Sequence, residues 1–163
     1  MKQIRILLAF LAPCLVLLLL ASSPASAQTE EKTFTVRGNQ DWVDTDIGVM
    51  PTDKVTFSAT GSICFTPRNK SACVGPGGMG QDAFEDRFPY LARGCKDPAR
   101  RIGHGALVGK LVGYNTYFFS VSNAGTIIGK QGTILIGIND CELPGNTGEF
   151  EVTITIERNA YKR

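Results

Sequence analysis

The sequence predicts an all-β protein, folded as an antiparallel sandwich of two packed sheets. Apolar and polar residues alternate with a period of two along several segments, as they do in half-buried strands. Eighteen glycines fit many short strands joined by tight turns. After residue 27, we find no helical period sustained over several turns. These patterns together are typical of a β-sandwich.

Four segments show the alternation most clearly. Residues 149–157 (EFEVTITIE) put apolar side chains on one face and Glu or Thr on the other. Residues 133–139 alternate in the same way, and because Leu135 makes the second face apolar too, we expect this strand to be buried on both sides. Residues 54–60 and 32–38 complete the set. The side chains predicted to face the core are Phe34, Val36, Val55, Phe57, Ala59, Ile134, Ile136, Ile138, Phe150, Val152, Ile154 and Ile156.

A long segment without this alternation lies between the predicted strands. Shorter alternation predicts further strands at 105–112 and 116–122, but residues 65–103 contain four prolines, a GPGGMG tract and two cysteines. A connection of this length inside a compact domain is often a functional loop. We expect residues 82–94 to form a short helix within it and the GPGGMG tract to be a flexible turn.

Residues 1–27 have the pattern of a secretory signal peptide. Lys2 and Arg5 precede a long apolar run, and the small residues ASA form a cleavage site at its end. A membrane anchor is the alternative, because the run approaches the ~18 apolar residues that can span a bilayer. The cleavage site favours removal, so we expect one exported domain at 28–163, secreted or periplasmic, with no membrane span.

The charge balance after removal of the signal peptide excludes one class of partner. The signal peptide holds two of the 17 basic residues and none of the 15 acidic ones, which leaves 15 of each sign. A nucleic-acid partner would require a basic surplus. We therefore expect no nucleic-acid binding.

Four cysteines follow the signal peptide, namely Cys64, Cys73, Cys95 and Cys141. An even number in an exported chain predicts two disulfides, for which three connectivities are possible. A zinc site is the less favoured alternative, because there is no C-x-x-C pair and His104 is the only histidine. Although the spacing does not choose the pairing, we expect Cys141 to join the long insertion through Cys95, and Cys64 to pair with Cys73.

Catalytic motifs are scarce in this chain. There is no G-x-S-x-G nucleophile elbow, and GPGGMG lacks the G-K-[ST] ending of a phosphate loop. His104, flanked by glycines, is interpreted as a loop or strand-edge residue and not as a general base. The adjacent carboxylates of Glu85 and Asp86 are typical of a solvated turn. We expect a protein that is not an enzyme.

Residues 137–150 (GINDCELPGNTGEF) connect the two clearest strands and are unusually rich in oxygen-bearing side chains. Asn139, Asp140, Glu142 and Asn146 fall within eight residues. Carboxylate and amide oxygens are the ligands that calcium prefers, so this loop could hold a cation or a polar ligand. The alternative is a turn in which these side chains bond their own backbone. The residues alone leave both interpretations open.

The order of several motifs bears on the choice between a ligand-binding loop and a simple turn at residues 137–150. They are DWVDTDIGV at 41–49, DKVTFSATG at 53–61, GHGALVGKLV at 103–112, GTILIGIND at 132–140 and PGNTGEFEVTI at 144–154. This order resembles the bacterial galactophilic lectins of the LecA type and related galactose-binding-like domains. The resemblance covers most of 33–157 and implies a jelly-roll-like sandwich that binds a carbohydrate or glycoconjugate.

The resemblance also implies calcium as a cofactor. Asp140 and Asn146 occupy positions that chelate calcium in that family, and backbone carbonyls near Val49–Met50 and in the 141–145 loop would complete the shell. A glycine stands where the family has a second asparagine, and Glu142 could supply the missing ligand.

Aromatic residues of the insertion suggest what surrounds the ligand. Sugar sites usually offer an aromatic face beside hydrogen-bonding groups. Phe84, Phe88 and Tyr90 could supply that face, and we expect Tyr90 to contact the ligand. The same aromatics suit a protein hot spot, so the alternative function is a protein-interaction module that contacts another exported protein through residues 65–103.

Overall fold

The computed structural model describes residues 28–65, 72–80, 83–84, 94, 96–113, 117–121 and 126–158. The predicted signal peptide, Phe88, Tyr90 and Cys95 lie outside these ranges. Of the predicted helix at 82–94, Ala83, Phe84 and Gly94 are described; the first two are helical and Gly94 lies in a turn. Within the described ranges, no helix is long and apolar enough to cross a membrane.

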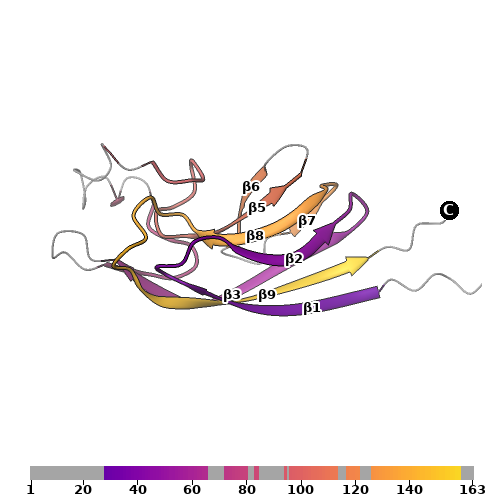
Figure 1. The fold of residues 1–163 in the computed structure, drawn as a ribbon, viewed down its shortest axis with the longest axis horizontal. Helices are drawn as coiled ribbons and strands as arrows, with labels where there is room; N and C mark the ends of the chain where they lie inside the picture. Colours follow the sequence, from indigo (N-terminus) through magenta and orange to yellow (C-terminus); the bar gives the residue numbers. More distant parts are fainter. Residues whose placement is uncertain are drawn as a thin grey trace, which may run out of the picture.

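The described residues form two antiparallel sheets packed face to face (Figure 1). The first sheet has the strand order β1-β9-β3-β4, with β7 also paired to β3, and the second has the order β2-β8-β5-β6. The first sheet contains β1 (Gln28–Arg37), β3 (Lys54–Phe65), β4 (Ala72–Val74), β7 (Thr126–Ile128) and β9 (Thr147–Arg158). The second contains β2 (Val43–Val49), β5 (Leu107–Val112), β6 (Tyr117–Ser120) and β8 (Gly132–Ile138). The predicted all-β antiparallel sandwich is confirmed.

The core lies between the sheets and is built from the alternating side chains. On β9, Phe150, Val152, Ile154 and Ile156 are fully buried, whereas Glu151 is exposed. A side-chain period of two places one face of each strand against the other sheet, which explains this pattern. The same holds for the other predicted core positions, of which Phe34 and Ala59 are only partly buried.

The prediction that β8 is buried on both sides is only partly right. Ile134, Ile136 and Ile138 face the core, but Leu135 lies on the outer face and is half-buried. Two residues along, the ring of Trp42 covers the outer face at Gly137, where a Cβ atom would come within 3.0 Å of the indole. The outer face of this sheet is therefore covered by Trp42 at Gly137 and partly open at Leu135.

The alternation pattern did not predict strand β2, because this strand contains a bulge. Its pairing with β8 shifts between Asp44 and Ile47, and Asp46 has a φ of 53°. The buried hydroxyl of Thr45 donates to the Ile134 carbonyl at 2.7 Å, so a polar side chain takes an inward position. An inserted residue breaks the period of two, which hides the strand from a periodicity search.

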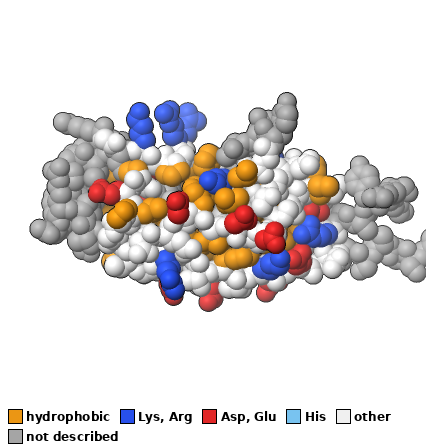
Figure 2. All heavy atoms as spheres, in the orientation of Figure 1, with side chains coloured by type: hydrophobic (Ala, Val, Ile, Leu, Met, Phe, Trp, Pro, Cys, Tyr) orange, Lys and Arg blue, Asp and Glu red, His pale blue; other side chains and the backbone are white. Residues whose placement is uncertain are grey.

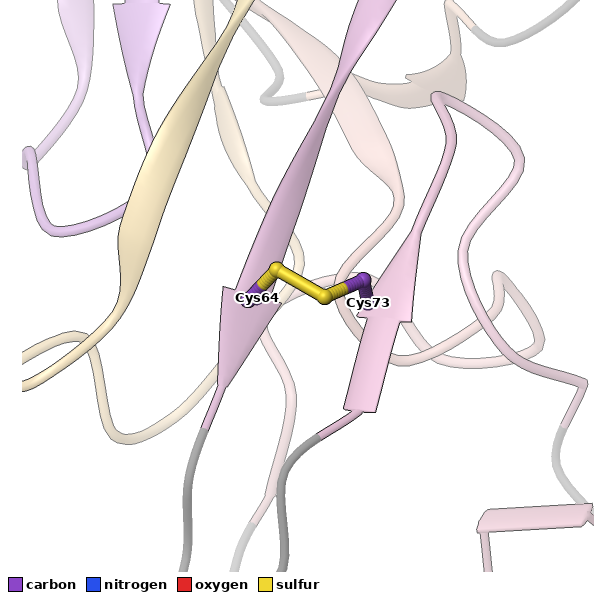
Figure 3. The surroundings of a disulfide bond; sticks show 2 residues. All are labelled: Cys64 and Cys73. Carbon is purple, nitrogen blue, oxygen red and sulfur yellow. A yellow bond between two sulfur atoms is a disulfide. The ribbon is translucent and has the colours of Figure 1, made fainter.

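One disulfide is visible directly. Cys64 on β3 and Cys73 on β4 are register partners and are joined by a disulfide, with their Cα atoms 4.0 Å apart (Figure 3). This confirms half of the expected pairing. Cys141 is also disulfide-bonded, to a partner outside the described residues. Its pairing with Cys95 stays a prediction.

A cluster of charged side chains lies at the end of the sandwich where β1 begins and β9 ends. Glu30 forms ion pairs with Lys32 and Arg158, both at 3.1 Å. The hydrogen bond from Lys32, and then that from Arg158, lowers the pKa of the Glu30 carboxyl. Arg158 also reaches the buried Asp53 at 3.2 Å, which links this end to the turn between β2 and β3.

Candidate functional site

The oxygen-rich loop lies at the opposite end of the sandwich from that charge cluster. It follows the end of β8 at Ile138, whereas Val49 pairs with Gly132 at the start of β8 (Figure 1). Seven strand residues at about 3.4 Å each separate the two ends by roughly 20 Å. The expectation that carbonyls near Val49–Met50 complete a shell around Asp140 is therefore wrong, because β2 runs antiparallel to β8.

Asn139 fastens the insertion to the end of β8. Its side chain is fully buried. The amide oxygen accepts a hydrogen bond from Ala99 N at 2.8 Å, and the amide nitrogen donates to the carbonyls of Ala99, Ile102 and Gly103 at 3.1, 2.9 and 3.1 Å. Asn139 thus binds a segment about 40 residues earlier in the chain, which makes it a structural anchor and not a ligand-contacting residue.

Asp140 turns its buried carboxylate back onto its own loop. One oxygen, Oδ1, accepts a hydrogen bond from Glu142 N at 2.7 Å, which is an Asx-type turn. The other, Oδ2, accepts one from Asn146 Nδ2 at 2.8 Å. The turn interpretation is thus right for Asp140, and the structure also brings Asp140 and Asn146 together as the resemblance implied.

The side chain of Asn146 has a fixed orientation. Its amide nitrogen lies 2.8 Å from the Asp140 carboxylate and 3.2 Å from the Gly38 carbonyl. Both neighbours can only accept, so the atom between them must be the donating NH2 group. Its amide oxygen therefore points away from Asp140. Glu142, by contrast, is exposed at the rim of the loop.

His104 completes the cluster. Its ring is buried, with 2% of the residue exposed. Nδ1 donates to the Asp97 carboxylate at 3.1 Å, and Nε2 lies 3.8 Å from Asp140 Oδ2. The ring stacks on Phe84 with centroids 3.9 Å apart and meets Phe65 edge-on at 4.8 Å.

His104 lies at a strand edge, as expected, because it forms an isolated β-bridge with Met79 just before β5, and its ring is buried between two carboxylates. One other expectation is corrected. Phe84 was expected to offer an aromatic face to a ligand, but it is buried at 3% exposure against His104. Only Asp140 and Asn146 could be linked from the sequence, because they share one loop. Neither periodicity nor spacing indicates that Asp97 and His104 join them.

The GPGGMG tract forms a turn, as predicted, in which Gly78 N donates to the Gly75 carbonyl at 2.9 Å. Met79 and His104 exchange backbone hydrogen bonds of 2.8 and 2.9 Å. Gly78 has a φ of 68°, and a Cβ atom there would come within 2.5 Å of Ala106 N. Glycine is required at this position because the tract packs directly against the backbone that carries His104.

The cluster does not fit calcium as its side chains are arranged. Asp97, His104 and Asp140 can offer ligand atoms that all lie within 4.8 Å of one another. One of these three is an imidazole nitrogen, however, and calcium takes oxygen ligands. Asn146 turns its nitrogen toward Asp140, and both Asp140 oxygens already accept protein hydrogen bonds. The arrangement is a hydrogen-bonded network that holds the exposed 141–145 loop.

These features define an antiparallel β-sandwich with a buried polar cluster beneath one end loop. No protein-family model matches the chain, and no curated protein matches it. Seven chains of solved structures do match. One is described as the EclA N-terminal domain, a PllA-like lectin, with a TM-score of 0.51 and 17% sequence identity, over 77% of this chain and 95% of that one. At that identity the likeness establishes the fold alone.

Proposed function

We propose that this protein is an exported, non-catalytic carbohydrate-binding domain, and that the 141–145 loop and its rim form the binding site. The carrying observation is that this loop is exposed while the residues that hold it are buried. Asp140 and Asn146 are each 5% exposed, whereas Cys141, Glu142 and Gly145 are exposed. A loop held rigid before binding loses less conformational entropy when a weak ligand binds.

Glu142 is the side chain that we assign to the ligand. Its backbone N–H is fixed to Asp140, so the position of the residue is set, while its carboxylate faces solvent. A carboxylate offers acceptors for two neighbouring hydroxyl groups, which is the arrangement that a sugar ring presents. Asp140 and Asn146 act behind it as positioning residues. Tyr90 stays part of the proposal as the aromatic face.

Export is part of the same proposal. The Cys64–Cys73 disulfide and the disulfide at Cys141 fit an extracellular or periplasmic setting, where disulfides persist. The predicted signal peptide at 1–27 accounts for how the chain would reach it. N-terminal sequencing of the secreted or periplasmic protein tests this, and a mature N-terminus near Gln28 is the expected result.

Calcium-dependent binding is the alternative form of this function, which the lectin resemblance suggests and against which the side-chain arrangement argues. Asp140 and Asn146 would hold the ion, with Glu142 as a third oxygen donor. The Asn146 amide would first have to rotate, and its bond to the Gly38 carbonyl would be lost. A binding assay with added calcium and with chelator separates this form from a metal-free one.

The experiment that tests carbohydrate binding is a glycan array with the purified protein and two variants. Glu142→Gln keeps the shape of the side chain but removes its charge, and we expect at least a tenfold weaker signal for any bound glycan. Glu151→Gln is the matched control, because Glu151 is exposed on β9 away from the loop. Glycan binding that survives Glu142→Gln unchanged would place the site elsewhere.

A second candidate function, protein interaction, has support from a different surface. Phe118 is 38% exposed on β6 and lies 6.1 Å from the Trp42 ring, over which Lys110 Nζ sits at 4.0 Å. Figure 2 shows hydrophobic side chains gathered around one basic side chain over β5 and β8. Aromatic residues beside a long cation are typical of protein hot spots. Phe118→Lys should abolish protein binding there and leave glycan binding intact.

A further inference from the structure

The exposed 141–145 loop raises the question of what holds it in place. We infer that the chain's own groups hold the Asp140 loop where a divalent cation would otherwise do so, and that ligand binding by this loop needs no metal. The inference rests on the proposed function for the sugar, but the cation part stands on the geometry alone. His104 is the residue assigned to this positioning role.

Both oxygens of the Asp140 carboxylate already accept hydrogen bonds from the protein. Only 2% of its side chain is exposed. Oδ1 accepts from Glu142 N at 2.7 Å, and Oδ2 accepts from Asn146 Nδ2 at 2.8 Å and faces His104 Nε2 at 3.8 Å. A cation would displace donors that are already at hydrogen-bond distance. It would then leave a buried amide group without one of its two acceptors.

The groups that face the Asp140 carboxylate are of the wrong kind for calcium, which takes oxygen ligands. His104 presents the ring nitrogen Nε2 at 3.8 Å from Oδ2, and Asn146 presents its amide nitrogen at 2.8 Å from the same oxygen. The ring cannot simply move aside, since it is stacked on Phe84 and contacts Phe65.

Zinc accepts an imidazole nitrogen as a ligand, but the cluster offers it too few protein ligands. A zinc ion bound to both Nε2 and Oδ2 would find His104 and Asp140 as its two protein ligands, because Asp97 is already bonded to Nδ1. Protein zinc sites use three or four protein ligands. Asp97 is instead placed as the carboxylate that orients the imidazole ring.

His104 therefore brings the insertion into contact with the Asp140 loop. Asp97 and His104 belong to the insertion side of the cluster, and Asp140 belongs to the loop. The His104 ring fills the space between the two carboxylates: Nδ1 donates to Asp97, and Nε2 lies 3.8 Å from Asp140 Oδ2. The position of Glu142 then depends on protein contacts alone.

Calorimetry with calcium chloride and with zinc chloride tests the cation part on the purified wild-type protein. We expect no saturable heat at about 10 mM calcium, which is at least tenfold above the typical Kd of extracellular calcium modules. A site with a Kd of about 1 mM would instead raise the Tm by roughly 3–6 °C at that concentration. Saturable binding of either ion with a matching rise in Tm would overturn the inference.

The glycan array, run in calcium and in EDTA, separates this inference from the proposed function. Signals equal within about twofold in both buffers support metal-free binding, whereas loss of signal in EDTA overturns it. If no glycan binds in either buffer and the cation titrations are flat, the carbohydrate proposal fails and the metal-free loop stands.

A pair of variants tests the role of His104 itself. His104→Ala empties the space between Asp97 and Asp140, so we expect this variant to gain a calcium-dependent rise in Tm that the wild type lacks. His104→Phe is the matched control, because its ring fills the same space without nitrogens and should gain none. A folded His104→Ala protein that stays insensitive to calcium would refute the assignment. If that variant does not fold, the wild-type titration decides alone.

Discussion

Asn139→Leu should be among the most destabilising single substitutions in this domain. Leucine has nearly the same shape as asparagine but offers neither donor nor acceptor. Asn139 is fully buried, and its amide bonds the backbone of the 99–103 segment at four points. The substitution therefore keeps the packing and removes only the polar contacts.

The size of the effect depends on which backbone groups keep another partner. The Ala99 carbonyl still accepts from Ile102 N at 3.3 Å, and the Gly103 carbonyl still accepts from Ala106 N at 3.1 Å. Ala99 N–H and the Ile102 carbonyl lose the Asn139 amide. A buried polar group left unsatisfied costs about 1–3 kcal/mol. Because Ile102 is half-buried and can be partly hydrated, we expect a total loss of about 2–4 kcal/mol.

Urea denaturation followed by tryptophan fluorescence measures this loss. The protein has one tryptophan, Trp42, and its ring packs on Gly137, two residues before Asn139. The midpoint should fall without a change in slope if unfolding stays two-state. Gln40→Leu, at an exposed amide, is the control and should change stability by no more than about 0.5 kcal/mol. A loss below about 1 kcal/mol for Asn139→Leu would refute the anchor.

Three further outcomes are expected. Val152→Ala should cost about 1–3 kcal/mol in chemical denaturation and Thr153→Ala little, because only the first faces the core; equal losses would refute the strand register. Replacing both Cys64 and Cys73 by serine should cost about 2.6 kcal/mol, from the loop entropy of a disulfide that spans a sequence separation of 9. Glu30→Gln should destabilise slightly at neutral pH and not in acid. The folded pKa of Glu30 lies below its unfolded value of 4.5, so its contribution is present above that value and is lost as pH falls through the folded pKa. A Tm difference that persists well below pH 4.5 would contradict that assignment.

Local periodicity carried most of the fold prediction, and its failures have local causes. The core faces of β8 and β9 follow directly from alternation, because each strand buries one face whatever its partners are. Strand β2 was missed because its bulge at Asp44–Ile47 changes the period. The strand β3 continues to Phe65, beyond the predicted end at residue 60, since Gly61 and Ser62 interrupt the apolar pattern while the ladder with β9 continues.

The site was less accessible to sequence reasoning for a physical reason. Asp140 and Asn146 share a six-residue separation, so a loop closure alone brings them together. His104 and Asn139 are far in the chain from Asp140 and Ala99, respectively, and meet them only through the packing of the insertion on the end of β8. No local pattern encodes such a meeting. The error about Val49–Met50 had a related origin, because a motif order does not state which end of a strand a residue occupies.

Two independent anchors fasten the same part of the insertion to the same end of the sandwich. Asn139 hydrogen-bonds the 99–103 backbone, and His104 hydrogen-bonds Asp97 through Nδ1 while its Nε2 lies 3.8 Å from Asp140 Oδ2. The first contact holds the insertion, and the second brings the insertion against the residue that precedes the 141–145 loop. Rigidity of this kind matters most for ligands whose individual contacts are weak, since each ordered residue saved on binding offsets about 1–2 kcal/mol. Under the proposed function, a hydroxyl-rich ligand at Glu142 belongs to that class, and the buried cluster would then act on its binding by holding the loop.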